Sequence, residues 1–108
     1  MQPEFIDSKY RLVWSEHFET RDDFKKLLNW MCDDFIFYQQ ECDNGLKVFF
    51  PNGWFFINST EKTTNEYEII VSSKCNKSFA KAYNKVLSVL NHFKKYKKSF
   101  LREVILCN

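Results

Sequence analysis

The chain has 108 residues, of which 28% are charged and 19% are aromatic. This length and composition favour one folded domain spanning residues 1–108 and exclude a disordered chain. The net charge of +2 is unevenly distributed, since residues 1–45 carry −5 and residues 46–108 carry +7. Such asymmetry suggests a surface for an acidic partner, although neutralisation between the two halves, or within a homodimer, would also explain it.

The cysteine and histidine content argues against metal or cofactor chemistry. The four cysteines form no CxxC pair, and only His17 and His92 could add imidazole ligands, so the spacing does not resemble a structural zinc site. The N-terminal residues do not resemble a signal peptide, and no apolar run is long enough to cross a membrane. We therefore expect a cytoplasmic protein with free thiols, no cofactor, no metal and no membrane contact.

The first predicted elements are a strand and a helix. Residues 10–14 alternate in polarity, which predicts a strand with Tyr10, Leu12 and Trp14 on one side. Thr20 is the predicted N-cap of the helix that follows, because its hydroxyl can accept a hydrogen bond from an orphaned backbone N–H. The helix should end near Asp33 and Asp34, where acidic residues meet the negative end of the helix dipole. Its apolar face is formed by Phe24, Leu27, Leu28, Met31 and Phe35.

Residues 35–58 predict a three-stranded antiparallel meander. The only two glycines follow asparagines, as Asn44-Gly45 and Asn52-Gly53, and each pair lies between β-prone runs. With two-residue turns, Glu41 would face Val48 and Phe50 would face Phe55. One face of the sheet would then carry Phe37, Val48, Phe50, Phe55 and Ile57. The other face would carry Tyr38, Phe49, Trp54 and Phe56, together with Lys47 and Gln40.

A second register is also compatible with the sequence around Pro51. Residues 50–53 fit a type I turn with Pro51 at its second position and a left-handed Gly53. That turn would add a bulge and shift the third strand by one residue, so Trp54 and Phe56 would move to the first face. The sequence leaves both registers open.

Another strand and a second helix complete the predicted elements. Residues 66–71 alternate, with Tyr67, Ile69 and Val71 inward. The second helix should begin near Asn76 and end or bend near Tyr96, where its apolar pattern fails, and residues 100–108 would dock as a short helix or a closing strand. The order β-α-β-β-β-β-α predicts an α+β fold, with a four- to five-strand antiparallel sheet and two helices packed on it.

The most informative candidate site is a set of lysines without nearby acids. No acidic residue occurs from Ile69 to Leu101, and like charges three or four residues apart on a helix repel each other. A neutralising partner, either an acidic protein surface or a phosphate backbone, would offset this repulsion. Lys94 and Lys97 should fall back towards the core side of the helix. The predicted basic face contains Lys74, Lys77, Lys81, Lys85, His92, Lys94, Lys95, Lys97 and Lys98.

A second candidate site is the aromatic face of the sheet. In the first register it contains Lys47, Phe49, Trp54 and Phe56. Aromatic rings beside a lysine on an open sheet can contact a partner or stack single-stranded bases. We prefer the interpretation that one helix covers each face of the sheet, with the second helix or the C-terminal tail over these residues.

The sequence supports a catalytic site less well than it supports the two binding surfaces. The only candidate histidine bases are His17, at an exposed strand exit, and His92, on the lysine face of the second helix, where neighbouring positive charge disfavours its protonation, so both are expected to be ordinary surface histidines. The only glycines are needed for turns, which argues against a phosphate-binding loop. Carboxylates for a metal-dependent nuclease exist at Asp33, Asp34, Glu41 and Asp43, but their spacing fits local capping and turns.

These observations favour a small non-enzymatic protein that docks on another protein and regulates or inhibits it. Its size and class resemble those of immunity proteins, antitoxins and phage-encoded inhibitors, and its most plausible partner is an acidic protein. The alternative is a nucleic-acid-binding module that uses the lysine-rich face of the second helix. A small nuclease is the third hypothesis.

Overall fold

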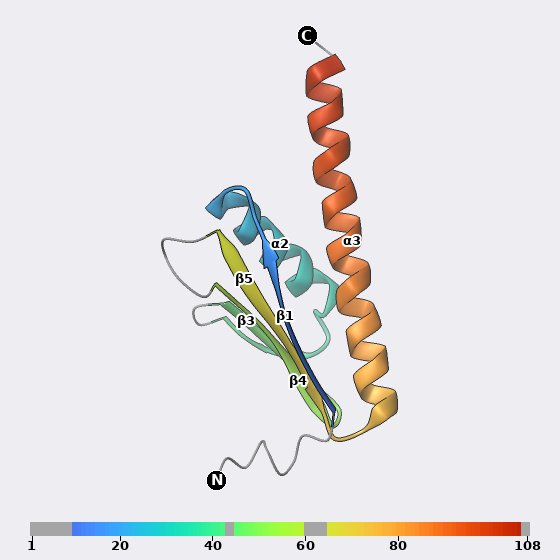
Figure 1. Ribbon diagram of the computed structural model, residues 1–108. Coiled ribbons are helices and arrows are strands. Elements are labelled where there is room, and N and C mark those ends of the chain that lie inside the picture. Colours follow the sequence, from blue (N-terminus) through green and yellow to red (C-terminus); the bar gives the residue numbers. More distant parts are fainter. Residues whose placement is uncertain (1–9, 43–44, 60–64, 107–108) are drawn as a thin grey trace.

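The fold is a five-stranded antiparallel sheet with two helices on one of its faces (Figure 1). The computed structural model describes residues 10–42, 45–59 and 65–106, and side chains up to residue 98. The elements are β1 (Tyr10–His17), α2 (Arg21–Asp34), β2 (Gln39–Glu41), β3 (Gly45–Phe50), β4 (Gly53–Ser59), β5 (Glu66–Ser73) and α3 (Asn76–Leu106). The predicted α+β class and element order are confirmed.

The strand order across the sheet is β1-β5-β4-β3-β2. Among the described residues, β1 therefore lies at one edge, and α2 connects it to the opposite edge, from which the meander returns. Each strand pairs antiparallel with its neighbour, and Trp14 of β1 lies opposite Ile69 of β5. The predicted inward positions Tyr67, Ile69 and Val71 are buried. This arrangement places β1 and β2 at the two edges of the sheet.

Helix α2 begins and ends where the sequence predicts. The hydroxyl of Thr20 accepts a hydrogen bond from the backbone N–H of Asp23 at 3.1 Å, which satisfies one of the donors left free at a helix start. The apolar face buries Phe24, Leu27 and Met31 against the sheet. The helix ends at Asp34, and the N–H of Phe35 still bonds the carbonyl of Met31.

The first hairpin of the meander differs from the prediction. Glu41 pairs with Lys47 rather than with Val48, and Gln40 pairs with Val48 on the face that the helices cover. The Gln40 amide donates to the carbonyls of Cys32 and Phe35 at 3.0 and 2.7 Å, which satisfies acceptors at the end of α2. Phe37, predicted inside, is 97% exposed. The predicted faces of Phe37 and Gln40 are thus wrong, and so is that of Tyr38, which packs against the core beside Phe35.

Both predicted registers of the second hairpin are also wrong. Phe50 pairs directly with Gly53, so Pro51 and Asn52 form the turn, and Asn52 takes the left-handed conformation with φ of 71°. Gly53 is needed for another reason, since a Cβ there would collide with the carbonyl oxygen of Ser72. The shift from the first predicted register is two residues. Because side chains alternate with a period of two, Trp54 and Phe56 still lie with Phe49.

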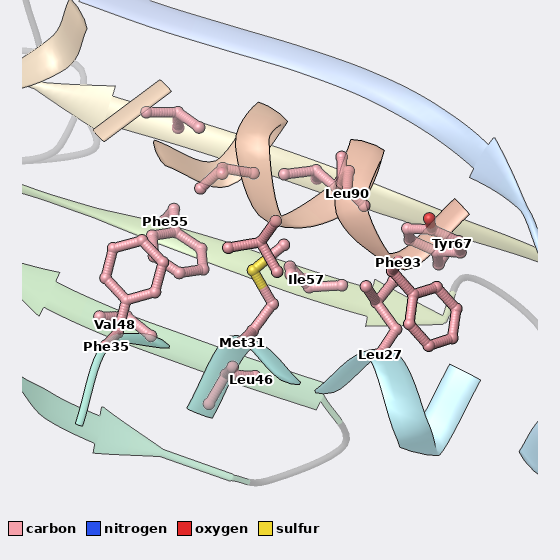
Figure 2. Packing of buried hydrophobic residues seen from close by; sticks show 14 of the residues in the cluster. Leu27, Met31, Phe35, Leu46, Val48, Phe55, Ile57, Tyr67, Leu90 and Phe93 are labelled. Carbon is pink, nitrogen blue, oxygen red and sulfur yellow. The ribbon is translucent and has the colours of Figure 1, made fainter. Parts of the chain in front are cut away.

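The hydrophobic core lies between the sheet and the two helices. Figure 2 shows Met31 of α2 beside Ile57 of β4, with Leu27 of α2 and Leu90 of α3 in the same layer of buried side chains. Met31, Val48 and Ile57 have no exposed surface. Burial of an aliphatic or aromatic side chain stabilises the folded state by roughly 1.5–3 kcal/mol. This layer therefore holds both helices on the same face of the sheet.

Helix α3 continues to Leu106, so the predicted end near Tyr96 is wrong. Two contacts beyond Phe93 explain the difference: Tyr96 packs on Trp30, with ring centroids 5.3 Å apart, and Lys97 reaches Asp23. Tyr96 and Lys97 therefore pack on α2, after the apolar pattern has been interrupted. Figure 1 shows the C-terminal end of α3 extending past the sheet, and the molecule measures 56 × 30 × 20 Å.

Candidate binding surfaces

The first candidate surface is the face of the sheet that α2 and α3 leave uncovered. Phe49 and Trp54 are cross-strand partners, and Phe56 lies between Lys47 and Ile70 on the neighbouring strands. The interpretation that a helix covers these residues is wrong, because both helices pack on the opposite face. We call this surface the open face and define it by Arg11, Val13, Lys47, Phe49, Trp54, Phe56 and Ile70.

Two cationic side chains contact the aromatic rings of the open face. The Lys47 ammonium lies 4.5 Å from the Trp54 ring centroid and 5.3 Å from that of Phe49. The Arg11 guanidinium lies 5.8 Å from the Trp54 ring. Cation–π contacts of this kind contribute about 0.5–1 kcal/mol when exposed. They place two positive charges beside a half-buried aromatic surface.

Four residues of the open face were predicted from the sequence, namely Lys47, Phe49, Trp54 and Phe56. Its other members, Arg11, Val13 and Ile70, were not. Arg11 reaches this site only because β1 pairs with β5, where Arg11 lies opposite Ser72, and Ser72 lies opposite Trp54. No local pattern in residues 10–17 indicates that pairing. For Ile70, the sequence offers one signal: it lies between Ile69 and Val71, which are predicted to face inward, so in an alternating strand it should face outward.

The open face is electrostatically polar along its strands. Arg11 lies near the turn between β3 and β4, and Lys47 lies midway along β3 with Glu41 of β2 opposite it, whereas Glu66 and Glu68 lie at the far end from the turn. There Glu66 is 3.9 Å from the His17 imidazole, and both side chains are exposed. Arg11 is therefore remote from Glu66 and Glu68, whereas Lys47 has an acidic cross-strand neighbour in Glu41.

The second candidate surface is the outward side of α3. Lys77, Lys81, His92 and Lys95 are exposed, and none of them forms an ion pair with a described residue. Lys98 is exposed too, and Lys74 precedes the helix with its N–H bonded to the carbonyl of Asn52. This surface belongs to the helix layer, on the other side of the sheet from the open face. The two predicted sites are thus not brought together.

Three members of the predicted basic face make contacts within the protein. The Lys94 ammonium donates to Glu16 at 3.0 Å and the Lys97 ammonium to Asp23 at 2.6 Å. The predicted position of these two lysines, towards the core side, is confirmed. Lys85 lies 4.6 Å from the Phe35 ring, and with Lys81 it lines a hollow of about 260 Å³ beside Tyr38 and Phe50.

The Lys97 pair changes the titration of Asp23. The Asp23 side chain is 10% exposed, and its hydrogen bond and charge interaction with Lys97 lower the pKa of the carboxyl group below the ordinary 3.8 despite an opposing desolvation effect. Asp23 is therefore ionised at neutral pH, which keeps the pair charged and ties α3 to the first turn of α2.

Groups capable of metal or nucleophilic chemistry are dispersed. Within residues 10–42, 45–59 and 65–106, no three His, Cys, Asp or Glu side chains gather as metal ligands would. Asp43, which the nuclease hypothesis requires, and Cys107 lie outside the described residues. Cys32, Cys42 and Cys75 are free thiols. None of the helices over the described residues is long and apolar enough to cross a membrane.

Comparison with known proteins adds no further constraint on these surfaces. No protein-family model matches the chain, and no curated protein matches it either.

Proposed function

We propose that this protein is a small binding module that docks on another protein through the open face of its sheet. The observation that carries the proposal is the Arg11–Trp54–Lys47 cluster on a face that neither helix covers. Aromatic and arginine side chains are the residues most often found at the energetic centre of protein interfaces. Such docking would regulate or inhibit the partner.

The cluster favours a protein partner that carries carboxylates over a stack of nucleic acid bases. Base stacking needs exposed ring faces, yet Lys47 already lies over both Phe49 and Trp54. A partner carboxylate can instead reach the two cations from outside, while apolar partner side chains contact Phe56, Ile70 and Val13. Val13 is 46% exposed and offers the most accessible apolar surface of the face.

Site-directed photo-crosslinking tests this proposal. Phe56 is replaced by p-benzoylphenylalanine, and the protein is irradiated in its native host. We expect one protein adduct of defined mass, which disappears when Lys47→Glu is added. The matched control places the same group at Asn84, an exposed position on α3, and should give no such adduct. A nucleic acid adduct from position 56, or identical adducts from both positions, would contradict the proposal.

A second candidate function is nucleic acid binding by the outward side of α3. It is supported by Lys77, Lys81 and Lys95, which are exposed and have no ionic partner among the described residues. Each phosphate contact that is lost should reduce the salt dependence of log K by about 0.9 for duplex DNA. The presence of lysines rather than arginines indicates general charge attraction and not base-specific contacts.

Matched charge reversals test this second candidate. The variant Lys77→Glu/Lys81→Glu should abolish the binding of labelled DNA or RNA in fluorescence polarisation. The control Lys25→Glu/Lys26→Glu makes the same change of charge on exposed positions of α2 and should retain binding. Equal losses in both variants would show that only the net charge matters.

A further inference from the structure

A cavity of about 270 Å³ lies where α2, α3 and the ends of β1 and β5 meet. Its floor is apolar and is formed by Phe18, Phe24, Leu27, Tyr67, Leu90 and Phe93. Figure 2 shows Tyr67 on the same side of the core as Leu27, Leu90 and Phe93. A dry protein cavity of about 150 Å³ accommodates benzene, so this one is large enough for a ring or a short alkyl chain.

The Tyr67 hydroxyl has no hydrogen-bond partner among the described residues, although the side chain is only 3% exposed. Buried tyrosine hydroxyls normally find a partner, because an unpaired polar group inside a protein is costly. Burial and the nearby charge of Glu16 raise the pKa of Tyr67, so its hydroxyl stays protonated and remains a donor. Glu16 lies directly opposite Tyr67 in the pairing of β1 with β5.

The remaining polar groups around the cavity are mainly donors. Lys94, Lys97 and Lys98 line it, and an ammonium carries three N–H donors. Lys94 makes one ion pair, with Glu16, and Lys97 makes one, with Asp23. Lys98 makes none with a described residue. The carboxylates that could attract a cation are thus already paired, except for the exposed Glu19 at the outer rim.

We propose that this cavity binds a small carboxylic acid with an apolar body. The ring or chain of about eight carbons occupies the apolar floor, and the carboxylate accepts from the Tyr67 hydroxyl and from Lys94 at the rim. Within this floor, the rings of Phe18 and Phe24 have centroids 5.2 Å apart and would contact the apolar body of the ligand. This site is separate from the cluster of Arg11, Lys47 and Trp54, since its apolar residues lie on the helix-covered side of the sheet, at the end of β1 that is remote from Arg11.

Calorimetric titration with octanoate, octylamine and acetate tests the ligand class. Octanoate should bind saturably, and acetate should not, because it lacks the apolar body. Octylamine should bind at least tenfold more weakly than octanoate, which corresponds to about 1.4 kcal/mol. Equal binding of octanoate and octylamine, or no saturation by octanoate below about 10 mM, would overturn the proposal.

Three variants test the assigned contacts. Tyr67→Phe removes only the hydroxyl and should weaken octanoate binding roughly three- to tenfold without lowering the melting temperature. Lys94→Met should weaken it by about tenfold or more, whereas Glu16→Gln breaks the same ion pair, keeps the ammonium and should retain binding. Trp54→Ala on the open face should bind as the natural protein does. Unchanged affinity in both Tyr67→Phe and Lys94→Met, or a loss caused by Trp54→Ala alone, would place octanoate elsewhere.

Discussion

The ammonium of Lys97 donates to the carboxylate of Asp23 at 2.6 Å, across 74 positions of sequence. The contact joins the sixth turn of α3 to the first turn of α2, and both side chains are largely buried. Asp23 is thereby placed at the positive end of the α2 dipole with a cation beside it. This pair accounts for the continuation of α3 beyond Phe93, where the apolar pattern of the helix is interrupted.

Breaking this pair should destabilise the fold in a pH-dependent way. Lys97→Met should lower the free energy of unfolding by about 1–2 kcal/mol at pH 7, measured by urea denaturation. Because the pKa of Asp23 is lower in the folded state than in the unfolded chain, the stabilisation is present above the ordinary pKa of 3.8 and is lost as pH falls through the folded-state pKa.

The difference between the natural protein and Lys97→Met should therefore be constant above about pH 5 and shrink towards pH 2. The matched control is Lys95→Met, since Lys95 is exposed and has no ion pair with a described residue. Equal effects of the two substitutions, or a difference that does not depend on pH, would contradict this account.

In the turn between β3 and β4, the neighbouring positions Asn52 and Gly53 should respond differently to substitution. Asn52 has φ of 71°, so Asn52→Ala should cost about 1 kcal/mol of stability and Asn52→Gly should cost little. Gly53→Ala should cost more, roughly 2–4 kcal/mol, because the new Cβ would meet the backbone of Ser72 and Ser73. Thermal unfolding of the three variants would measure this order, and a tolerated Gly53→Ala would show that the register is incorrect.

Local signals explain which parts of the fold could be predicted. The start of α2 follows from Thr20, whose capping bond involves a residue three positions away. The inward positions of β5 follow from strict alternation of apolar residues. In both places the chemistry that decides the structure lies within one turn or one strand, so sequence patterns are sufficient.

Contacts between residues far apart in the sequence explain which parts of the fold could not be predicted. Gln40 faces the helices because its amide bonds carbonyls at the end of α2, and the local alternation of residues 37–41 gives no sign of this. Arg11 joins the open face only through the pairing of β1 with β5. At the end of α3, Lys94 and Lys97 interrupt the apolar pattern because their partners, Glu16 and Asp23, lie on other elements.

Neighbouring aromatic residues of β4 should differ sharply in their contribution to stability. Phe55 is fully buried, so Phe55→Ala should cost about 3–5 kcal/mol. Trp54 faces outward and contacts Lys47 and Arg11, so Trp54→Ala should cost only about 1–2 kcal/mol. Chemical denaturation of both variants gives the comparison. Similar losses would mean that the open face is covered within the protein and is not available to a partner.

The cysteines should react with iodoacetamide at different rates. Cys75 lies just before α3, its carbonyl bonds the N–H of Phe79, and backbone N–H groups of Ser78 and Lys77 lower the pKa of its thiol. Burial and the neighbouring Cys42 raise the pKa of Cys32. Cys75 should therefore be alkylated faster than Cys32 at pH 7, as measured by peptide mass spectrometry. Cys75→Ser keeps a capping oxygen and should remove the fast reaction while the protein stays folded. A fast reaction that persists at Cys32 in this variant would contradict the assignment.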